Sequence, residues 1–335
     1  MKEAIVSPEL KVDIVDSPIP KPDDDQILIQ VVVSGSNPKD WKVPEWRQVT
    51  ANPGDDIAGI VSQVGSNVTE FKPGDRVAAF HQIMAPHGSY AEYAIAWQHT
   101  TFHLPKGTTF EGGAAIPLAA MTAAVGLYSR LGLPQPWTPA TEPIPLIIYG
   151  AASSVGAYAV QFAQKSNIHP LICVAGNSKS YVETLIDRGK GDTIIDYRDG
   201  DDAVVEALKK AAGASKLLYA FDATSEKNSY VNISKVLDQG AKITLVLPPQ
   251  GYEFPSHITQ SVTLVGSVHS DEKDFGYVYF RYITRGLQEG WFKPQPQVVV
   301  PGGLQGLQKA LEDLKAGKAH GIKYVFRIAD TEGIQ

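Results

Sequence analysis

The stretch Ile147–Phe162, IIYGAASSVGAYAVQF, decides the fold class of this protein. An apolar run ends at Gly150, and small residues fill the turn up to Gly156. Beyond the turn, apolar side chains recur at the spacing of an amphipathic helix. A strand, a tight turn and a helix in this order aim backbone N–H groups and the positive end of a helix dipole at one spot, which suits a pyrophosphate. The stretch therefore predicts a dinucleotide-binding turn, with Ser153, Ser154, Val155 and Gly156 at the phosphates.

The chain on the C-terminal side of this turn continues the alternation of strands and helices. Apolar, strand-like runs alternate with helix-length amphipathic stretches. We expect strands within residues 145–150, 169–176, 192–196, 216–222, 241–248 and 261–268, and helices within 154–166, 179–189, 201–213 and 226–240. Near-continuous apolar strands separated by helices predict a parallel sheet that is covered on both faces.

The N-terminal third of the chain has a different pattern of apolar residues. Residues 1–118 contain short apolar runs broken by proline and glycine, which is typical of an antiparallel, barrel-like β unit. The segment after residue 271 holds two amphipathic stretches and one strand, too little for a domain of its own, so we expect it to rejoin the β unit. The predicted organisation is a β-rich domain over 1–118, completed by 271–335, and an α/β domain over 119–270.

Composition excludes several classes of protein. With 43% hydrophobic residues and a net charge of −6 in 335 residues, the chain is neither disordered nor suited to gripping nucleic acid or an anionic membrane. Its single cysteine, Cys173, excludes an intramolecular disulfide and a multi-thiolate metal site. The first residues lack the apolar segment of a secretion signal, and no window approaches the length of a membrane span. We expect a cytoplasmic protein.

The end of the second predicted strand bears on the choice of nucleotide. An NAD site places an acid about 20 residues beyond the glycine turn, to bind the ribose hydroxyls. Here that position carries no acid; it reads Asn177, Ser178, Lys179 and Ser180. Hydroxyls and a lysine suit a 2′-phosphate, to which Tyr197 could add a phenol. The alternative interpretation is a solvated turn with a surface tyrosine.

These features resemble the medium-chain dehydrogenase/reductase superfamily, in its zinc-free branch of quinone oxidoreductases and fungal trans-acting enoyl reductases. The resemblance covers nearly the whole chain, and its motifs occur in the expected order. They are Ser36–Lys42, Pro53–Gly59, Phe71–Val77, Gly88–Tyr93, Pro117–Ala123, the glycine turn and Ile195–Arg198.

The resemblance implies a GroES-like β domain clasping a Rossmann domain, with NADPH in the cleft between them. Beyond the turn and strand residues already named, it implies cofactor contacts at Lys39, Asp40, Trp41, Lys42, Leu247, Ala319 and His320. It places the substrate near Met121, Thr122, Gly266, Ser267, Val268, His269 and Ser270.

The resemblance also bears on zinc. Zinc-dependent members of the superfamily bind a catalytic metal through an early cysteine, a Gly-His-Glu motif and a second cysteine. This chain has Pro38–Asp40 at the first position and Gly54-Asp55-Asp56 at the second. Its eight histidines form no metal-binding spacing, and Cys173 lies in a predicted buried strand. We therefore expect no metal, and reduction of an activated C=C bond or a quinone rather than alcohol oxidation.

The resemblance assigns chemical roles to three residues. Hydride addition to the β-carbon builds negative charge on the substrate carbonyl, which a positioned donor stabilises. Lys42 would stabilise this charge, anchor the nicotinamide ribose or supply the proton, and Asp40 would hold Lys42 or the ribose. Thr122 would hydrogen-bond the nicotinamide amide or the substrate carbonyl. The alternatives are that Lys42 is a solvated loop charge and that Thr122 bonds back to its own helix.

Three functions are compatible with these observations. The first is an NADPH-dependent enoyl reductase whose substrate is free or attached to a carrier protein. The second is a quinone or enal reductase of detoxification type, and the third is a dinucleotide-binding protein without turnover. Both a monomer and a homodimer joined through the sixth strand remain compatible with the sequence.

Overall fold

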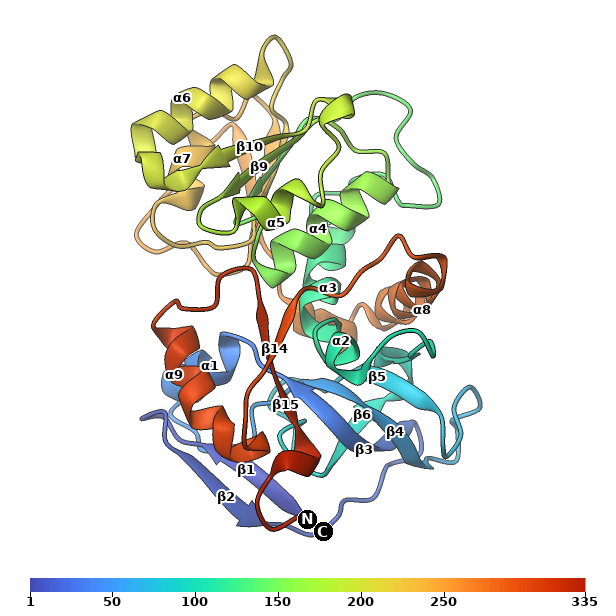
Figure 1. Ribbon diagram of the computed structural model, residues 1–335. Helices are drawn as coiled ribbons and strands as arrows, with labels where there is room; N and C mark the ends of the chain where they lie inside the picture. Colours follow the sequence, from blue (N-terminus) through green and yellow to red (C-terminus); the bar gives the residue numbers. More distant parts are fainter. Residues whose placement is uncertain (335) are drawn as a thin grey trace. The chain divides into compact units, whose positions relative to one another are not determined.

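The computed structural model describes residues 1–334 and divides the chain into two compact units (Figure 1). The first unit joins residues 1–121 to the C-terminal segment that begins at Gly266, and the second runs from Thr122 to Val265. The sequence-based limits, residues 118 and 271, lie close to these boundaries.

The second unit is built on a sheet of six strands in which every neighbouring pair is parallel. In spatial order the strands are β10 (Thr193–Asp196), β9 (Leu171–Ala175), β8 (Leu146–Tyr149), β11 (Tyr219–Asp222), β12 (Ala241–Leu245) and β13 (Ile258–Val262). Ile147 and Ile148 point to opposite faces of β8, yet neither side chain is exposed. Both faces of the sheet are therefore covered, which confirms the predicted doubly wound α/β fold.

Four helices alternate with these strands. They are α4 (Ser154–Lys165), α5 (Lys179–Glu183), α6 (Asp201–Ala212) and α7 (Ser229–Ser234). Val204 of α6 and Ile233 of α7 join strand residues in one apolar cluster. Helix α5 is shorter than predicted, because the Asp187 side chain accepts a bond from the Gly189 N–H and caps a separate 3₁₀ turn, η3 (Arg188–Lys190).

The sixth strand was predicted too late in the chain. It was expected within residues 261–268, but β13 ends at Val262 and residues Val265–His269 form a 3₁₀ turn, η5. The partner strand β12 ends at Leu245, whose carbonyl takes the last ladder bond from the Thr263 N–H at 2.7 Å. The apolar run beyond Thr263 has no neighbouring strand to pair with, so local sequence pattern was misleading there.

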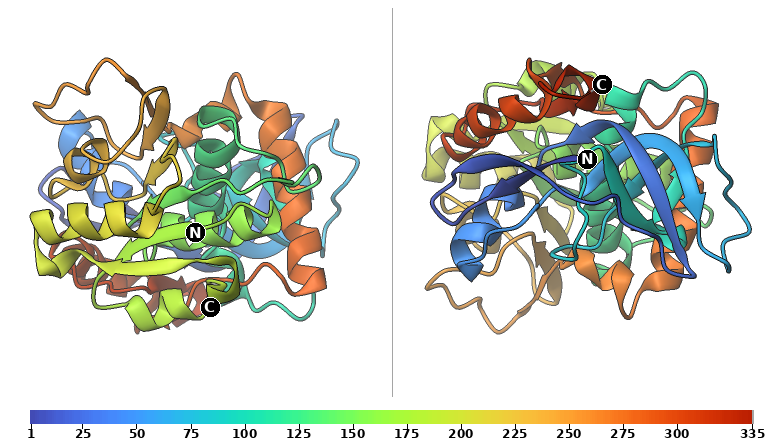
Figure 2. Two further views of the ribbon diagram at one scale, coloured as in Figure 1. Left: turned by 90° about the horizontal axis from the view of Figure 1, so that it is seen from above. Right: turned by 90° about the horizontal axis from the view of Figure 1, so that it is seen from below.

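The first unit contains a seven-stranded, largely antiparallel sheet and a separate hairpin-like pair. The sheet consists of β14 (Gln297–Val299), β15 (Lys323–Arg327), β3 (Gln26–Gly35), β4 (Asp56–Val64), β5 (Arg76–Phe80) and β7 (Thr101–His103) in this order, with β6 (Tyr93–Trp97) paired to β3; the pair is β1 (Lys2–Val6) and β2 (Val12–Asp16). Because β15 pairs with β3, the C-terminal segment completes a sheet begun near the N-terminus. The strands are strongly twisted (Figure 2).

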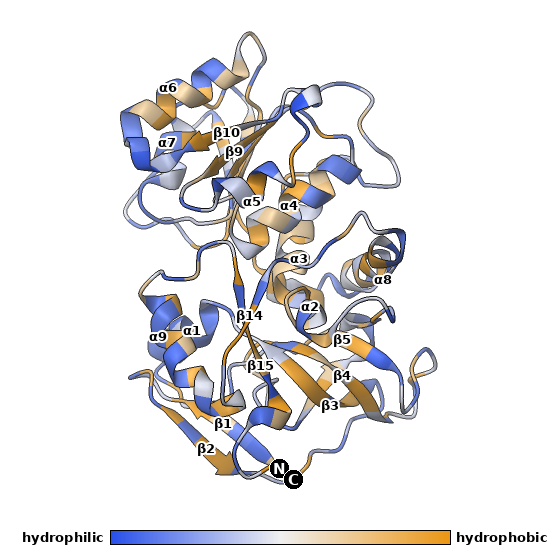
Figure 3. Ribbon diagram, viewed as in Figure 1, coloured by the Kyte–Doolittle hydropathy of each residue, from blue (hydrophilic) through white to orange (hydrophobic). Residues whose placement is uncertain are grey.

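Helices of the first unit lie around this sheet. They are α1 (Lys39–Arg47), α2 (Phe110–Ala114), α8 (Lys273–Glu289) and α9 (Leu307–Lys315), with the turns η1 (Gln98–Thr100), η6 (Gly303–Gly306) and η7 (Ile328–Asp330). Figure 3 shows that α8 and α9 carry an apolar and a polar side, as expected of surface helices. Helix α3 (Pro117–Ala124) continues as a π-helical segment, η2 (Val125–Arg130). This unit has the GroES-like, β-rich architecture expected from the sequence.

Candidate functional site

The predicted phosphate turn lies between β8 and α4. Gly150 adopts a φ of +77°, a left-handed conformation that glycine takes without strain. Ser153 is the N-cap of α4, and its Oγ accepts a hydrogen bond from the Gly156 N–H at 3.0 Å. A Cβ on Gly156 would lie 2.3 Å from the Gly150 carbonyl oxygen, so glycine is needed for the helix to begin this close to the strand. As an acceptor in this bond, the Ser153 hydroxyl keeps its own hydrogen for an anion.

A basic cluster lies where β9 and β10 end side by side. Lys179 Nζ is 2.7 Å from Asp196 Oδ2, and Arg198 Nη2 is 2.6 Å from the same oxygen. Arg198 also donates to Oδ1 of Asn177. Hydrogen bonds from Arg198 and Lys179 hold the pKa of Asp196 far below its usual range. Two cations face one carboxylate, so one positive charge remains in excess, and nearly half of each cationic side chain is exposed.

Tyr197 lies against the same edge. A Cβ on Gly176 would be 2.6 Å from Cε1 of Tyr197, so the ring covers the backbone just after β9. The structure therefore places Asn177, Lys179 and Tyr197 together and adds Arg198, which the sequence analysis missed. The position of Arg198 directly after Tyr197 is the sequence feature that could have identified it. A partly exposed cluster with an excess positive charge suits a phosphate monoester.

The remaining residues predicted to contact a cofactor lie in both units. Ser178 precedes α5 and Ser180 lies within it, while Leu247 is half-buried just beyond β12. In the first unit, Lys39–Lys42 form the first turn of α1, so Lys42 lies on a helix and not in a loop. Ala319 and His320 lie between α9 and β15.

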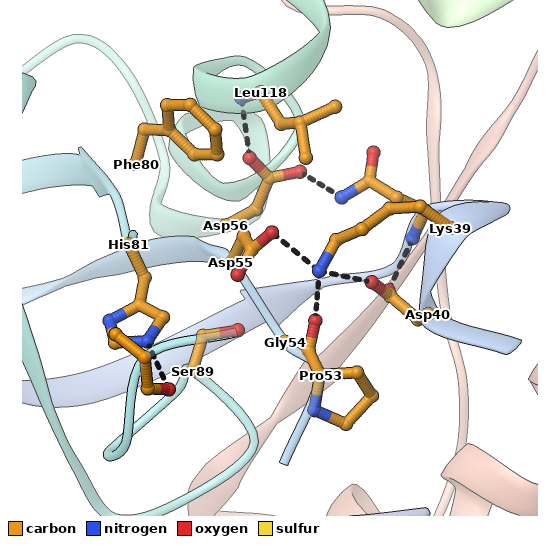
Figure 4. Close-up of polar contacts among 12 residues, drawn as sticks. Lys39, Asp40, Pro53, Gly54, Asp55, Asp56, Phe80, His81, Ser89 and Leu118 are labelled. Carbon is orange, nitrogen blue, oxygen red and sulfur yellow. Dashed lines mark hydrogen bonds and ion pairs between the residues drawn. The ribbon is translucent and has the colours of Figure 1, made fainter. Parts of the chain in front are cut away.

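A buried charge cluster connects α1, β4 and β15 of the first unit. Figure 4 shows its members Lys39, Asp40, Asp55 and Asp56. Lys39 Nζ pairs with Asp55 Oδ2, lies 3.1 Å from Asp40 Oδ1 and donates to the Pro53 carbonyl. Tyr90 donates its hydroxyl hydrogen to Asp40 Oδ2 at 2.5 Å. The sequence predicts Lys39 and Asp40 as site residues but not Asp55 or Tyr90, because the proximity of these two depends on how the strands pair.

A second ammonium group completes this cluster. Lys323 Nζ lies 2.6 Å from Asp56 Oδ2 and 2.8 Å from Asn37 Oδ1, and both charged side chains of the pair are buried. The other Asp56 oxygen accepts the Leu118 N–H at 2.7 Å. Lys323 is on the last strand of the chain, so no local motif could have joined it to Asp56.

Burial sets the protonation behaviour of the cluster. Burial raises the pKa of Asp55 to about 7 against the opposing charge of Lys39, and it also raises the pKa of Asp40. Burial alone would lower the pKa of Lys39, but the charges of Asp55 and Asp40 outweigh it and raise that pKa, so Lys39 stays an ammonium. The pKa of about 7 means that Asp55 can exchange a proton near neutral pH.

Lys42 lies one turn further along α1, beside two tryptophans. Its Nζ is 5.4 Å from the ring centre of Trp41 and 5.8 Å from that of Trp46, distances typical of cation–π contacts. Trp46 is 61% exposed, an unusual position for so large an apolar ring. This face of α1 therefore presents an ammonium and an aromatic surface together.

The residues predicted at the substrate fall on α3 and η5. Met121 and Thr122 are buried on α3, and Gly266–His269 belong to η5, with Ser270 directly after it. His269 Nε2 is 3.3 Å from the Phe80 carbonyl oxygen. Burial lowers the pKa of His269 to about 3, so its imidazole is neutral and contributes no charge.

Three further features of the described residues bear on function. No group of three or more His, Cys, Asp or Glu side chains within residues 1–334 is arranged to hold a metal ion. Cys173 is buried in β9, and burial raises its thiol pKa far above the usual range. Among the same residues, none of the helices combines the length and hydropathy required to cross a bilayer.

Comparison with known proteins agrees with this architecture. Residues 23–106 match the alcohol dehydrogenase GroES-like domain family. The chain is 54% identical over 312 residues to trans-enoyl reductase fsr4 of Gibberella fujikuroi, covering 91% of this chain and 92% of that protein. It belongs to the enoyl reductase branch of the medium-chain dehydrogenase/reductase superfamily. Trans-enoyl reductase resD of Aspergillus sclerotiorum is another member of this branch, at 30% identity over 93% of this chain and 96% of its own.

Solved structures show the same medium-chain reductase fold. A putative zinc-dependent alcohol dehydrogenase from Rhizobium etli matches with a TM-score of 0.84 at 24% identity, over 97% of this chain and 98% of that one. The CurK enoyl reductase matches with a TM-score of 0.77 at 18% identity, over the same shares of the two chains. The chain is thus an enoyl-reductase-like oxidoreductase by family, with the fold of the superfamily.

Proposed function

We propose that this medium-chain reductase is an NADPH-dependent enoyl reductase that saturates the C=C bond of an α,β-unsaturated carbonyl compound without zinc. One observation carries the proposal: the 54% identity to a trans-enoyl reductase extends over more than nine-tenths of both chains. Several further relatives that bear the same name match over comparable lengths.

The basic cluster at the end of β9 supports the choice of NADPH. Lys179 and Arg198 carry one positive charge more than Asp196 neutralises, and NADPH differs from NADH by a phosphate on the adenosine ribose. The turn from Gly150 to Gly156 would receive the pyrophosphate at the N-terminus of α4. A mycobacterial relative of this fold, matched with a TM-score of 0.78 at 18% identity, was solved in complex with NADPH.

When bound, the reduced nicotinamide supplies a hydride to the β-carbon of the substrate. The protein's task is to orient the substrate and to stabilise the charge that develops on its carbonyl oxygen. We assign the charge stabilisation to Lys42 and a hydrogen bond to the carbonyl or the nicotinamide amide to Thr122. Asp40 binds Lys39, Tyr90 and the Asn37 N–H, and so holds the first turn of α1 in place.

The donor set supports zinc independence. A catalytic zinc site uses thiolates, imidazoles or carboxylates that converge on the ion. In the first unit, the carboxylates of Asp40, Asp55 and Asp56 converge on ammonium groups instead, namely those of Lys39 and Lys323. The ammonium groups of Lys39 and Lys323 thus supply to these carboxylates the positive charge that a metal ion would otherwise bring.

The test is oxidation of NADPH and NADH by the purified protein with a panel of enoyl thioesters, enones and quinones. We expect NADPH-dependent loss of the substrate C=C bond, with the saturated product identified by mass spectrometry and no effect of a chelator. Turnover of quinones alone would support the detoxification reductase instead. Binding of NADPH with no turnover of any acceptor would identify a non-catalytic dinucleotide-binding protein.

A further inference from the structure

Reduction of a C=C bond consumes a proton as well as a hydride, so a reductase of this kind needs an acid that can be recharged. The cluster of Figure 4 contains a candidate in the pair formed by Lys39 and Asp55. The superfamily resemblance implies a cofactor contact for Lys39 and no role for Asp55, and it assigns proton transfer to neither residue. The following inference rests on the proposed enoyl reductase function.

Within this cluster, Lys39 is the member that reaches the surface. Its side chain is 17% exposed, whereas those of Asp40, Asp55 and Asp56 are at most 1% exposed and that of Lys323 is 3% exposed. Lys39 also begins α1, which carries Lys42 one turn later. Any exchange of a proton between the cluster and a substrate would therefore pass through the Lys39 ammonium.

Asp55 is distinguished from its neighbours by an unused oxygen. Both oxygens of Asp40 and both oxygens of Asp56 have a hydrogen-bond or ion-pair partner. Asp55 Oδ2 pairs with Lys39, but Oδ1 is buried without a hydrogen-bond partner among residues 1–334. In Figure 4 this second oxygen points away from Lys39. A buried, unpartnered carboxylate oxygen is costly, and a proton on it removes the charge that makes it so.

The net charge of the cluster also favours protonation of one carboxylate. Three carboxylates face two ammonium groups, so the fully ionised cluster carries one negative charge in excess. The charged and titratable groups around Asp55 are Lys39 and Asp40 on α1, Asp56 on β4, Lys323 on β15, Tyr90 before β6 and His81 after β5. Burial lowers the pKa of His81 and raises that of Tyr90, so both are neutral near pH 7. One proton on Asp55 therefore makes the cluster neutral.

We propose that Lys39 delivers the proton to the α-carbon of the substrate and that Asp55 reloads Lys39. In this step the Lys39 Nζ–H bond breaks, and the electron pair of the substrate enolate forms the new C–H bond. The neutral Lys39 amine then takes the proton held by Asp55, and solvent returns one proton to the pair through Lys39, the member that reaches the surface. Nothing besides the hydride transfer is oxidised or reduced, and the net cost is one proton from water.

The contacts of Lys39 show which hydrogen can be released. Asp40 and Asp55 hold the ammonium through ion pairs, whereas its hydrogen bond goes to the neutral carbonyl of Pro53. An interaction with a neutral acceptor is weaker than one between charged partners. The hydrogen directed at Pro53 is therefore the one that can turn to a substrate at the smallest cost, while the two ion pairs keep the ammonium in place.

The first experiment compares the pH dependence of kcat in the wild-type enzyme and in Asp55→Asn. Because the relay needs a protonated Asp55, wild-type turnover should be constant below about pH 7 and fall above it. Asp55→Asn keeps an acceptor for Lys39 but holds no exchangeable acid, so kcat should drop about 100-fold and lose this titration. Tyr90→Phe is the matched control, since it alters the same cluster without changing a charge and should keep the pH profile.

Two Lys39 variants separate proton delivery from electrostatics. Lys39→Arg keeps the charge but cannot release a proton, because an arginine stays protonated in proteins. We expect Lys39→Arg to be as slow as Lys39→Met; recovery of turnover by arginine would mean that only the charge matters and would overturn the relay.

A third measurement uses the wild-type protein alone and so does not depend on whether a variant folds. Infrared difference spectra of the wild-type protein between about pH 5 and about pH 9 should show the carbonyl band of a buried carboxylic acid that disappears with a midpoint near pH 7. Absence of this band would overturn the proposal. A protein that reduces no alkene would overturn the proposed function together with the relay, whereas alkene reduction with an unchanged pH profile in Asp55→Asn would overturn the relay alone.

Discussion

The ring of Tyr197 covers the backbone of Gly176, so closely that a Cβ at position 176 would lie 2.6 Å from Cε1 of the ring. This contact fixes a phenol beside Lys179 and Arg198, at the edge where β9 and β10 end. Gly176 follows one strand and Tyr197 follows the next, and parallel pairing brings the two ends together. The ends of β9 and β10 therefore form a cationic surface flanked by an aromatic ring.

The charge at this edge leads to a prediction about nucleotide preference. Lys179→Ala and Arg198→Ala should each weaken NADPH binding at least tenfold, because each removes a charge-assisted hydrogen bond worth about 1.5–3 kcal/mol. NADH binding should change little, since NADH lacks the phosphate. Fluorescence titration with both nucleotides measures the difference. Lys209→Ala, an exposed lysine of α6 paired with Glu206, is the control; equal losses for NADH and NADPH would contradict the assignment.

The turn between β8 and α4 should tolerate no larger residue at Gly156. In Gly156→Ala the added methyl group meets the Gly150 carbonyl at 2.3 Å, so the helix must move away from the strand. We expect a loss of about 1–3 kcal/mol in the free energy of unfolding, measured by urea denaturation, and weaker dinucleotide binding. Gly107→Ala, where a Cβ meets nothing within 4 Å, should be neutral. Equal stability of the two variants would show that the turn can relax.

The buried pair of Lys323 and Asp56 should show strong coupling. Lys323→Met leaves the Asp56 carboxylate buried without its ammonium and should destabilise the protein by about 3–5 kcal/mol. The double variant Lys323→Met/Asp56→Asn should be more stable than the single Lys323→Met variant, because no charge is left unpaired. A double-mutant cycle by chemical denaturation checks this. Additive effects would mean that the two charges do not interact.

The raised pKa of Asp55 predicts a specific dependence of stability on pH. An aspartate in the unfolded chain titrates near 3.9, whereas folding moves the pKa of Asp55 to about 7. Between these values the folded state binds more protons, so rising pH destabilises it through this group, by up to ~1.4 kcal/mol for each pH unit. Relative to Asp55→Asn, the wild-type free energy of unfolding should fall from about pH 4 to about pH 7 and then level off. Parallel curves for the two proteins would exclude a raised pKa.

Lys42 and Thr122 should be needed for turnover and not for folding. We expect Lys42→Ala and Thr122→Ala each to reduce kcat at least tenfold, because each removes a donor to charge developing in the reaction. Circular dichroism and thermal unfolding should stay close to wild type. Lys11→Ala, which removes an exposed lysine paired with Asp13, serves as the control. Wild-type rates in both variants would remove these residues from the mechanism.

Local sequence pattern was sufficient for much of the second unit. The run of apolar strands and amphipathic helices predicted the parallel sheet, and the small residues from Gly150 to Gly156 predicted where α4 begins. Such features depend on neighbours within a few residues, so they can be predicted from the periodicity of the sequence. The prediction was wrong where tertiary context decided, as at β13, which ends when its partner β12 offers no further backbone groups.

The amino-acid sequence by itself determined the superfamily fold, the phosphate turn and the basic character of residues 177–180, because each is written in short, contiguous segments. Only the tertiary structure decided that Arg198 joins Lys179 on Asp196, and that Lys39, Asp55, Asp56 and Lys323 share one buried charge cluster. The physical reason is that a buried charge is stable only beside its counter-charge, and strand pairing, not distance along the chain, brings position 323 to position 56.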